Sequence, residues 1–154
     1  MVTLGMKKEV IVMKYIVLVS HGMFAPGLHD ALGMLVGENR EDILSTSLKN
    51  GMGADEFAEN VRKLISVVKE DDEILLFADL LGGSPLTVSA NVIAEEGLLD
   101  RTTMISGMNL PLVLSAAVMK DDMDIDELKA ELIPEGQDAI TEFTIQATED
   151  EDDI

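Results

Sequence analysis

The 154-residue sequence contains no cysteine, and aromatic residues make up only 3% of it. Without cysteine the chain has no disulfide, no thiolate nucleophile and no cysteine-ligated metal site. Hydrophobic residues nevertheless make up 47%, which is enough to fill one core. Because aromatics are so few, we expect a single globular domain whose core is aliphatic, with the ten Met residues as core filler rather than ligands.

Basic residues are also scarce, with 11 Lys and Arg against 30 Asp and Glu and a formal net charge of −19. Such a chain repels phosphate backbones and anionic membranes, so nucleic acid is not an expected partner. A protein partner is instead expected to present a basic surface. The five consecutive acids at 149–153 are interpreted as a solvated tail rather than a metal site.

A long hydrophobic run near the N-terminus is missing too. The apolar segment at residues 9–12 is too short to span a bilayer, and Lys14 interrupts it. With no other targeting signal, we expect a cytoplasmic protein. Met13 offers an alternative start, so we expect an N-terminal extension over 1–13, one domain over 14–147 and an acidic tail over 148–154.

Short apolar strands alternate with amphipathic helices along the whole chain. This alternation predicts an α/β fold, a doubly wound and mainly parallel sheet, for which 2-1-3-4 is a common strand order. A last segment alternates apolar and polar residues, which is typical of an antiparallel edge strand. The predicted strands are 15–19, 43–48, 74–78, 102–106 and 141–147, and the predicted helices are 26–36, 55–68, 85–96, 111–119 and 124–132, the last one stopping near Pro134.

Two polar loops follow the first and third strands. The first strand is followed by Ser20-His21-Gly22, and the third by Asp79 and by Gly82-Gly83-Ser84-Pro85. If the strand order is 2-1-3-4, these loops are neighbours over the crevice where such sheets bind ligands. Taken alone, each residue has a plainer reading: Ser84 is an N-cap followed by Pro at the first helical position, and a strand-end histidine is often a surface residue.

Together the loops describe a site for a phosphoryl group carried on histidine. Asp79 can hold one imidazole nitrogen of His21, which leaves the other as a nucleophile. The Gly82-Gly83 backbone and the helix start at Ser84 offer N–H groups to an anion. His29, by contrast, lies within a predicted helix without such neighbours and is interpreted as a partly exposed helical residue.

Other site classes fit poorly. The sequence has no Gly-x-x-x-x-Gly-Lys-Ser/Thr loop for a nucleoside triphosphate, and Ser84 lacks the Gly-x-Ser-x-Gly pattern of a hydrolase. Gly22 does not open a dinucleotide-binding Gly-x-Gly-x-x-Gly pattern, and only two histidines are present, so a zinc site is not expected. We therefore expect no metal and no other cofactor.

Three ordered motifs resemble one family: Ser20-His21-Gly22, Asp79-x-x-Gly82-Gly83-Ser84-Pro85 and Gly107-Met108-Asn109-Leu110-Pro111. Between about Lys14 and Phe143 the chain is similar to the enzyme IIA component of the mannose-type (mannose, fructose, sorbose, gluconate) bacterial sugar phosphotransferase system. It departs at Leu80-Leu81, where some members carry a more polar or aromatic pair. Because the chain runs into an acidic tail, we expect a free-standing IIA.

The resemblance implies roles for residues and partners. His21 would be phosphorylated, on the ring nitrogen farther from the backbone, by the carrier protein HPr. The phosphoryl group would pass to a IIB protein and then to a sugar entering through the IIC and IID membrane components. Asp79 would hold the other ring nitrogen, and Ser84 would lie near the phosphoryl group. The family forms homodimers that exchange a C-terminal strand, here residues 141–147.

Two alternative functions stay open at this point. One is the phosphotransfer subunit of a dihydroxyacetone kinase system, which is similar in fold and also uses an early histidine. The other is a non-catalytic module that binds a small anion in the same crevice. The second and third motifs favour the sugar-transport branch.

Overall fold

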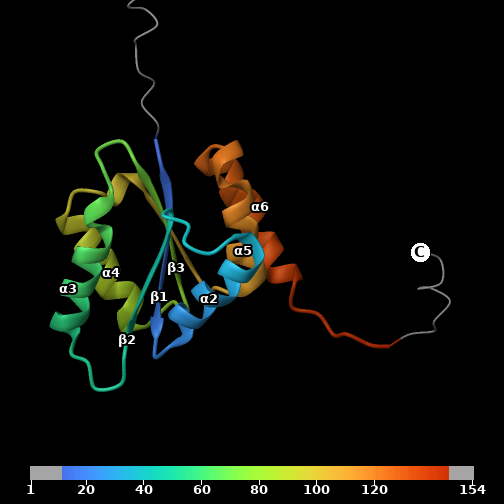
Figure 1. Cartoon of the computed structure of the whole chain (residues 1–154), viewed down its shortest axis with the longest axis horizontal. Coiled ribbons are helices and arrows are strands. Elements are labelled where there is room, and N and C mark those ends of the chain that lie inside the picture. The colour runs from blue at the N-terminus through green and yellow to red at the C-terminus, as the bar shows by residue number, and fades with distance from the viewer. Residues whose placement is uncertain (1–11, 146–154) are drawn as a thin grey trace, which may run out of the picture.

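The computed structural model describes residues 12–145 and contains one parallel sheet of four strands (Figure 1). The strands are β1 (Lys14–His21), β2 (Ile43–Leu48), β3 (Glu73–Ala78) and β4 (Thr102–Ser106). Their order is β2-β1-β3-β4, and all three neighbouring pairs are parallel. The predicted α/β fold and its strand order are confirmed, and β1 and β3 lie side by side in the middle of the sheet.

Helices cover both faces of the sheet (Figure 1). One face carries α2 (Phe24–Val36), α5 (Leu110–Met119) and α6 (Ile125–Asp138), and the other carries α3 (Ala54–Leu64) and α4 (Ser84–Glu95). Three short 3-10 turns, Ile65–Val67, Leu99–Arg101 and Lys120–Asp122, complete the connections. The helix that follows β1 therefore lies on one face of the sheet, and the helix that follows β3 lies on the other.

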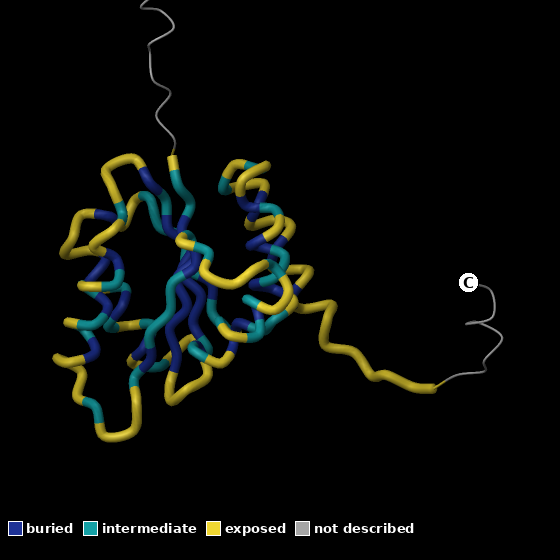
Figure 2. The backbone as a smooth tube through the Cα atoms, in the orientation of Figure 1, coloured by how far each residue is buried: buried dark blue, intermediate teal, exposed yellow. Residues whose placement is uncertain are grey.

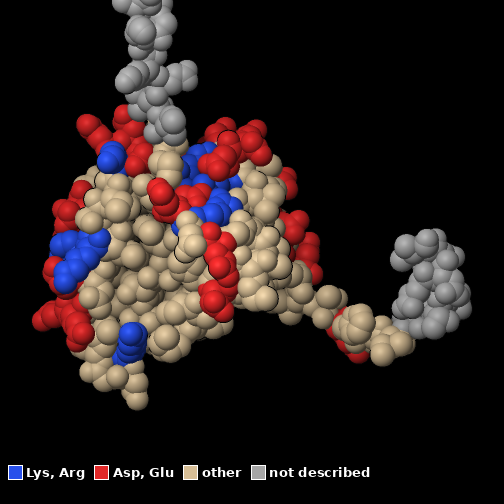
Figure 3. Space-filling view, viewed as in Figure 1, with Lys and Arg blue, Asp and Glu red and all other residues tan. Residues whose placement is uncertain are grey.

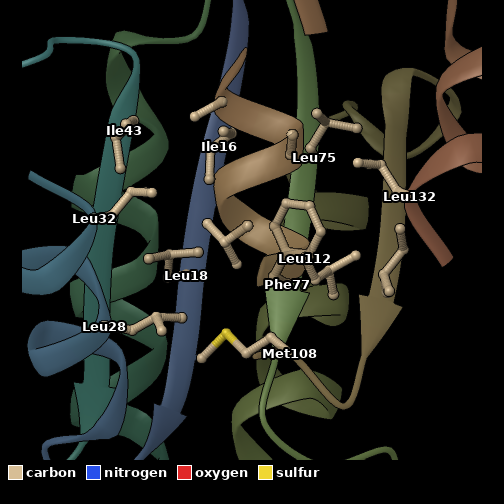
Figure 4. Packing of buried hydrophobic residues seen from close by; sticks show 14 of the residues in the cluster. Ile16, Leu18, Leu28, Leu32, Ile43, Leu75, Phe77, Met108, Leu112 and Leu132 are labelled. Atoms are coloured by element: carbon tan, nitrogen blue, oxygen red, sulfur yellow. The ribbon is translucent and has the colours of Figure 1, made fainter. Parts of the chain in front are cut away.

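The core forms two layers because the central strands are apolar on both faces. Successive side chains of a strand point to opposite faces, so Ile16 and Leu18 pack under α2 and α5 while Val17 and Val19 pack under α3 and α4. Figure 4 shows the first layer, where Phe77 and Met108 lie among aliphatic side chains. As the composition predicts, the core is mainly aliphatic.

Helix α6 does not stop near Pro134 as predicted but continues to Asp138 with the proline inside it. Tertiary packing outweighs the lost backbone hydrogen bond. Leu132 is fully buried, and Gly136 lies so close to α5 that an added Cβ would be 3.1 Å from the Cβ of Leu112. The Asn109 side-chain amide also donates a hydrogen bond to the Gly136 carbonyl, at 3.1 Å.

The predicted antiparallel edge strand at 141–147 is not seen in the single chain. Residues 141–145 have no regular structure and leave the domain as an exposed segment (Figure 2), and residues 146 and 147 lie outside the described range. A strand needs a neighbouring strand to pair its backbone groups, and this segment has none within the described part of the chain. The acidic tail at 148–154 and most of the extension at 1–13 also lie outside the described residues.

Between residues 12 and 145, no helix is both long enough and apolar enough to cross a membrane.

Candidate functional site

His21 and Asp79 meet at the carboxyl end of the sheet. His21 is the last residue of β1, and Asp79 directly follows β3, the neighbouring strand. The ring nitrogen Nδ1 of His21 lies 2.9 Å from Oδ2 of Asp79, and the His21 backbone N–H donates to the same oxygen at 3.0 Å. The structure thus brings together the two residues that the sequence placed at adjacent strand ends.

The Asp79 carboxylate is held in its ionised form. Partial burial acts to raise its pKa, but the hydrogen bonds from the His21 backbone and ring and from the Leu80 N–H lower the pKa below its ordinary value. The Leu80 N–H donates to the other carboxylate oxygen, Oδ1, at 2.9 Å. Because an ionised carboxylate only accepts hydrogen bonds, Nδ1 is the donor to it, and in the neutral ring Nε2 then carries the free lone pair.

Gly83 lies directly against the His21 ring. A Cβ built on Gly83 would be 2.5 Å from Cε1 and 3.1 Å from Nε2 of His21, which no side chain could occupy without moving the ring. The neighbouring Gly82 has open space at the same position. Glycine at position 83 is therefore what lets the helix start approach the free ring nitrogen.

The start of helix α4 offers backbone donors beside this nitrogen. Gly83 is the N-cap, and its carbonyl accepts from the Thr87 N–H at 3.2 Å. The preceding N–H groups of Ser84 and Leu86 have no helical acceptor and can serve an anion, which the positive end of the helix also attracts.

Ser84 differs in detail from the sequence prediction. It is the first residue of the helix and not the N-cap, because Gly83 has the extended backbone of the cap and Pro85 follows inside the first turn. Ser84 is exposed, so its side chain can be reached from the solvent. The hydroxyl is therefore available beside the unpaired N–H groups.

Ser20 positions the first loop, a role that the sequence analysis did not find. Its side chain is fully buried, and Oγ accepts from the Ala25 N–H at 2.7 Å while donating to the His21 carbonyl at 3.0 Å. It therefore links the end of β1 to the start of α2. Strand β1 runs through Ser20, whereas the sequence predicted that it stops before this residue. The position of a polar residue directly after an apolar run is the signal that could have indicated the role of Ser20.

The other histidine and the third motif have hydrogen-bond partners other than His21 and Asp79. Nδ1 of His29 lies 2.7 Å from the Ser45 hydroxyl in β2, and burial lowers the pKa of His29 against the opposing charge of Asp30. Asn109 caps α5 through the Leu112 N–H at 2.9 Å and donates to Gly136 in α6. The third motif thus builds the fold, and its Met108 N–H supports the end of β3 by donating to the Ala78 carbonyl.

The part of the chain that the structure describes contains no group of three or more His, Cys, Asp or Glu side chains arranged to hold a metal ion.

Comparison with curated proteins finds two EIIA components among its relatives. The PTS system fructose-specific EIIA component of Bacillus subtilis (strain 168) is 26% identical over 113 residues, which are 73% of this chain and 75% of the relative. The PTS system sorbose-specific EIIA component of Lacticaseibacillus casei is 28% identical over 122 residues, or 77% of this chain and 82% of the relative.

Solved structures agree with this grouping. The phosphotransferase system component EIIA from Streptococcus agalactiae matches with a TM-score of 0.73 and 26% identity, covering 85% of this chain and 98% of that one. The mannose/sorbose specific IIA subunit from Enterococcus faecalis matches with a TM-score of 0.67 and 27% identity, covering 88% and 98%. The family model described as PTS system fructose IIA component matches residues 15–133, and the chain therefore belongs to this mannose-type family of phosphotransferase system IIA components.

Proposed function

We propose that this chain carries a phosphoryl group on Nε2 of His21. The observation that supports the proposal most directly is the pair of His21 and Asp79, in which the 2.9 Å contact occupies Nδ1 and leaves Nε2 as the nucleophile. His21 is 45% exposed, so a second protein can bring a phosphoryl donor to this nitrogen. Membership of the IIA family makes the chain a component of a sugar phosphotransferase system.

The transfer exchanges one N–P bond for another. The lone pair of His21 Nε2 attacks the phosphorus of a donor phosphohistidine in line with the bond that breaks, and that bond's electron pair returns to the donor imidazole. No proton has to leave His21, because Nδ1 keeps its proton while it donates a hydrogen bond to Asp79. The positive charge that develops on the ring lies beside an ionised carboxylate.

The start of α4 would hold the transferred group. The N–H groups of Ser84 and Leu86 have no acceptor within the helix, the Ser84 hydroxyl would add a donor, and the open space beside Gly82 leaves room for the oxygens. Donors placed before the reaction stabilise developing charge without reorganisation. The site therefore works through its own N–H groups and needs no cofactor.

HPr is the donor that we propose, and a IIB protein is the acceptor. From IIB the phosphoryl group reaches a sugar that enters through the IIC and IID membrane components. The named relatives act in fructose-specific and sorbose-specific systems. The family match favours this role over the dihydroxyacetone kinase subunit and over a non-catalytic anion-binding module.

Phosphate labelling tests the proposed function. The chain is incubated with phosphoenolpyruvate, enzyme I and HPr, and the bound phosphate is tested for stability in acid and base. We expect one phosphoryl group per chain that is labile in acid and stable in base, and that depends on HPr. An unlabelled chain at high HPr concentration and long incubation would contradict the proposal.

Replacing Asp79 by Asn is expected to slow phosphorylation about 10- to 150-fold, because a hydrogen bond to a charged group contributes about 1.5–3 kcal/mol. The rate is measured by rapid quench at saturating HPr. The ¹⁵N shifts of the His21 ring should show a mixture of tautomers in the variant. Asp30→Asn, which changes the acid beside the other histidine, is the matched control. An unchanged rate in Asp79→Asn would show that Asp79 makes no contribution to phosphoryl transfer.

We also propose a homodimer in which the segment at 141–147 pairs with the partner chain. Two features support it: β4 is an edge strand beside a hollow of about 340 Å³, and Ile140, Phe143 and Ile145 are each at least 80% exposed. Light scattering of the full chain should give twice the mass of one chain, and Phe143→Asp should lower it. A monomeric wild type would contradict the proposed dimer.

We also propose the division of the chain into an N-terminal extension over 1–13, one domain over 14–147 and an acidic tail over 148–154.

A further inference from the structure

The outer edge of β2 carries backbone groups that no described residue pairs. Strand β2 has a neighbour on one side only, where the Asp42 carbonyl accepts from β1 and the Leu48 carbonyl accepts from the loop after β1. Because the backbone groups of alternate residues in a strand point to the same side, the N–H and C=O groups of Ser45 and Ser47 point away from β1. Such a row of groups is a template on which a further strand can pair.

Natural edge strands are blunted by charged residues, by proline or by a bulge, and β2 has none of these. Its six residues, Ile43–Leu48, carry no charge and no proline, and they pair with β1 in unbroken register. In the view of Figures 1 and 3 this edge faces the reader, and Figure 3 shows a mostly uncharged surface over β2 with acidic side chains beside it, over α2. A regular, uncharged edge of this kind is expected to be covered by a further segment.

A hollow of about 460 Å³ lies beside the open edge and is lined by residues of α2, of β2 and of the loop that joins them. Asp30 and Glu38 belong to the lining, and neither carboxylate has a hydrogen-bond or ion-pair partner among residues 12–145. Arg40, the one Lys or Arg in the lining, is already paired with Asp42 at 2.7 Å. The hollow therefore offers two unpaired carboxylates to a segment that brings basic side chains.

The N-terminal segment has the composition and the length that this edge requires. Residues 1–11 contain Lys7, Lys8 and a single acid, Glu9, in a chain with 30 acidic and 11 basic residues. An extended chain spans about 3.3–3.6 Å per residue, so this segment can reach about 35–40 Å. It leads into β1, the neighbour of β2, and a strand outside β2 would lie only about 10 Å from β1. A few residues can thus cross the start of β2, and enough remain to pair along its six residues.

We propose that residues 1–11 pair with the open edge of β2 in their own chain, as a fifth strand. The pairing is antiparallel, because the segment runs toward the start of β1 while β2 runs parallel to β1. The two lysines of the segment then lie beside the two unpaired carboxylates of the hollow. The added strand gives the open N–H and C=O groups of β2 their partners and keeps other chains from pairing with this edge.

Amide hydrogen exchange in the full chain tests this pairing. The N–H groups of Ser45 and Ser47 face the proposed strand, and those of Leu44 and Thr46 face β1. In Lys7→Glu/Lys8→Glu the new acids would meet the carboxylates of the hollow. We therefore expect Ser45 and Ser47 to exchange at least about tenfold faster than in the wild type, because exchange reports local opening. Leu44 and Thr46 should exchange at the same rate in both proteins.

Lys63→Glu/Lys129→Glu is the matched control, since it makes the same change of charge at exposed lysines of α3 and α6. We expect this variant to exchange like the wild type at all four amides. If exchange at Ser45 and Ser47 is the same in the wild type and in Lys7→Glu/Lys8→Glu, the proposal is overturned.

A nitroxide attached at Thr3→Cys gives a second measurement, because the chain has no other cysteine. We expect it to broaden the amide signals of β2 much more than those of β4, which lies three strand positions further away. In a mixture of spin-labelled chains with ¹⁵N-labelled chains that carry no nitroxide, the β2 signals should stay sharp. Broadening of β2 in the mixture would assign the edge to the segment of a second copy, and sharp β2 signals in the labelled chain would place the segment elsewhere. Either result overturns the proposal.

Discussion

Replacement of His21 by alanine is expected to reduce HPr-dependent phosphate labelling below detection. The expectation follows from the geometry, because the His21 imidazole is the nucleophile beside the start of α4. Asp79 is an ionised hydrogen-bond acceptor and cannot replace it. The measurement is the stoichiometry of acid-labile phosphate in the wild type and the variant at equal exposure to phosphoenolpyruvate, enzyme I and HPr.

His29→Ala is the matched control for this experiment. His29 is the only other histidine, and its Nδ1 is engaged with the Ser45 hydroxyl away from the site. We expect the control to label like the wild type. Because His21 is 45% exposed, its removal should leave the far-ultraviolet circular dichroism and the thermal midpoint almost unchanged. Label that survives in His21→Ala would place the phosphoryl group on another residue.

The second large effect is expected from the smallest change, Gly83→Ala. Gly83 has φ −97° and ψ 163°, which alanine adopts without strain, so the backbone itself accepts the substitution. The new Cβ would lie 2.5 Å from Cε1 of His21, and the ring would have to swing away from Asp79 or from the start of α4. A displacement near 1 Å costs about 100-fold in rate when positioning carries the catalysis, and we expect a loss of that size.

Gly82→Ala separates this steric effect from a general effect of alanine in the loop. An added Cβ at Gly82 meets nothing within 4 Å, so the His21 ring keeps its place and the loss of rate should be far smaller than in Gly83→Ala. Rapid-quench rates at saturating HPr are the readout, and the thermal midpoints of both variants check that they fold. If both alanine variants transfer equally well, the close approach of Gly83 to the ring has no part in catalysis.

The elements of this fold follow closely from local sequence patterns. Strands β2 and β4 have the predicted bounds, and helix α4 starts one residue before the predicted position. Local patterns work here because continuous apolar runs and helical spacing reflect which residues are buried. They fail for α6, where Pro134 predicted an end but contacts of Gly136 and Leu132 with the rest of the core carry the helix to Asp138.

The candidate site was partly predictable for the same reason. His21, Asp79 and the glycine loop could be picked out because polar residues directly follow apolar strands, and ligands gather at such ends. Ser20 and Gly83 could not be assigned their contacts, because a hydrogen bond to Ala25 or an approach to an imidazole depends on how two chain segments meet. The contact of Asn109 with α6 could not be predicted either, because its partner Gly136 is 27 residues away in the sequence.

The sequence by itself determined the alternation of strands and helices, the aliphatic core and the residues that can carry phosphoryl chemistry, because these depend on composition and short-range spacing. The tertiary structure alone decided that Nδ1 of His21 meets Asp79 while Nε2 faces the start of α4. It also decided where the charge lies: a net charge of −19 says nothing about place, and the loops that follow the four strands contain only two ionisable side chains, Lys49 and Asp79. Distances between side chains and the distribution of charge are set by strand order and helix packing, which no local pattern contains.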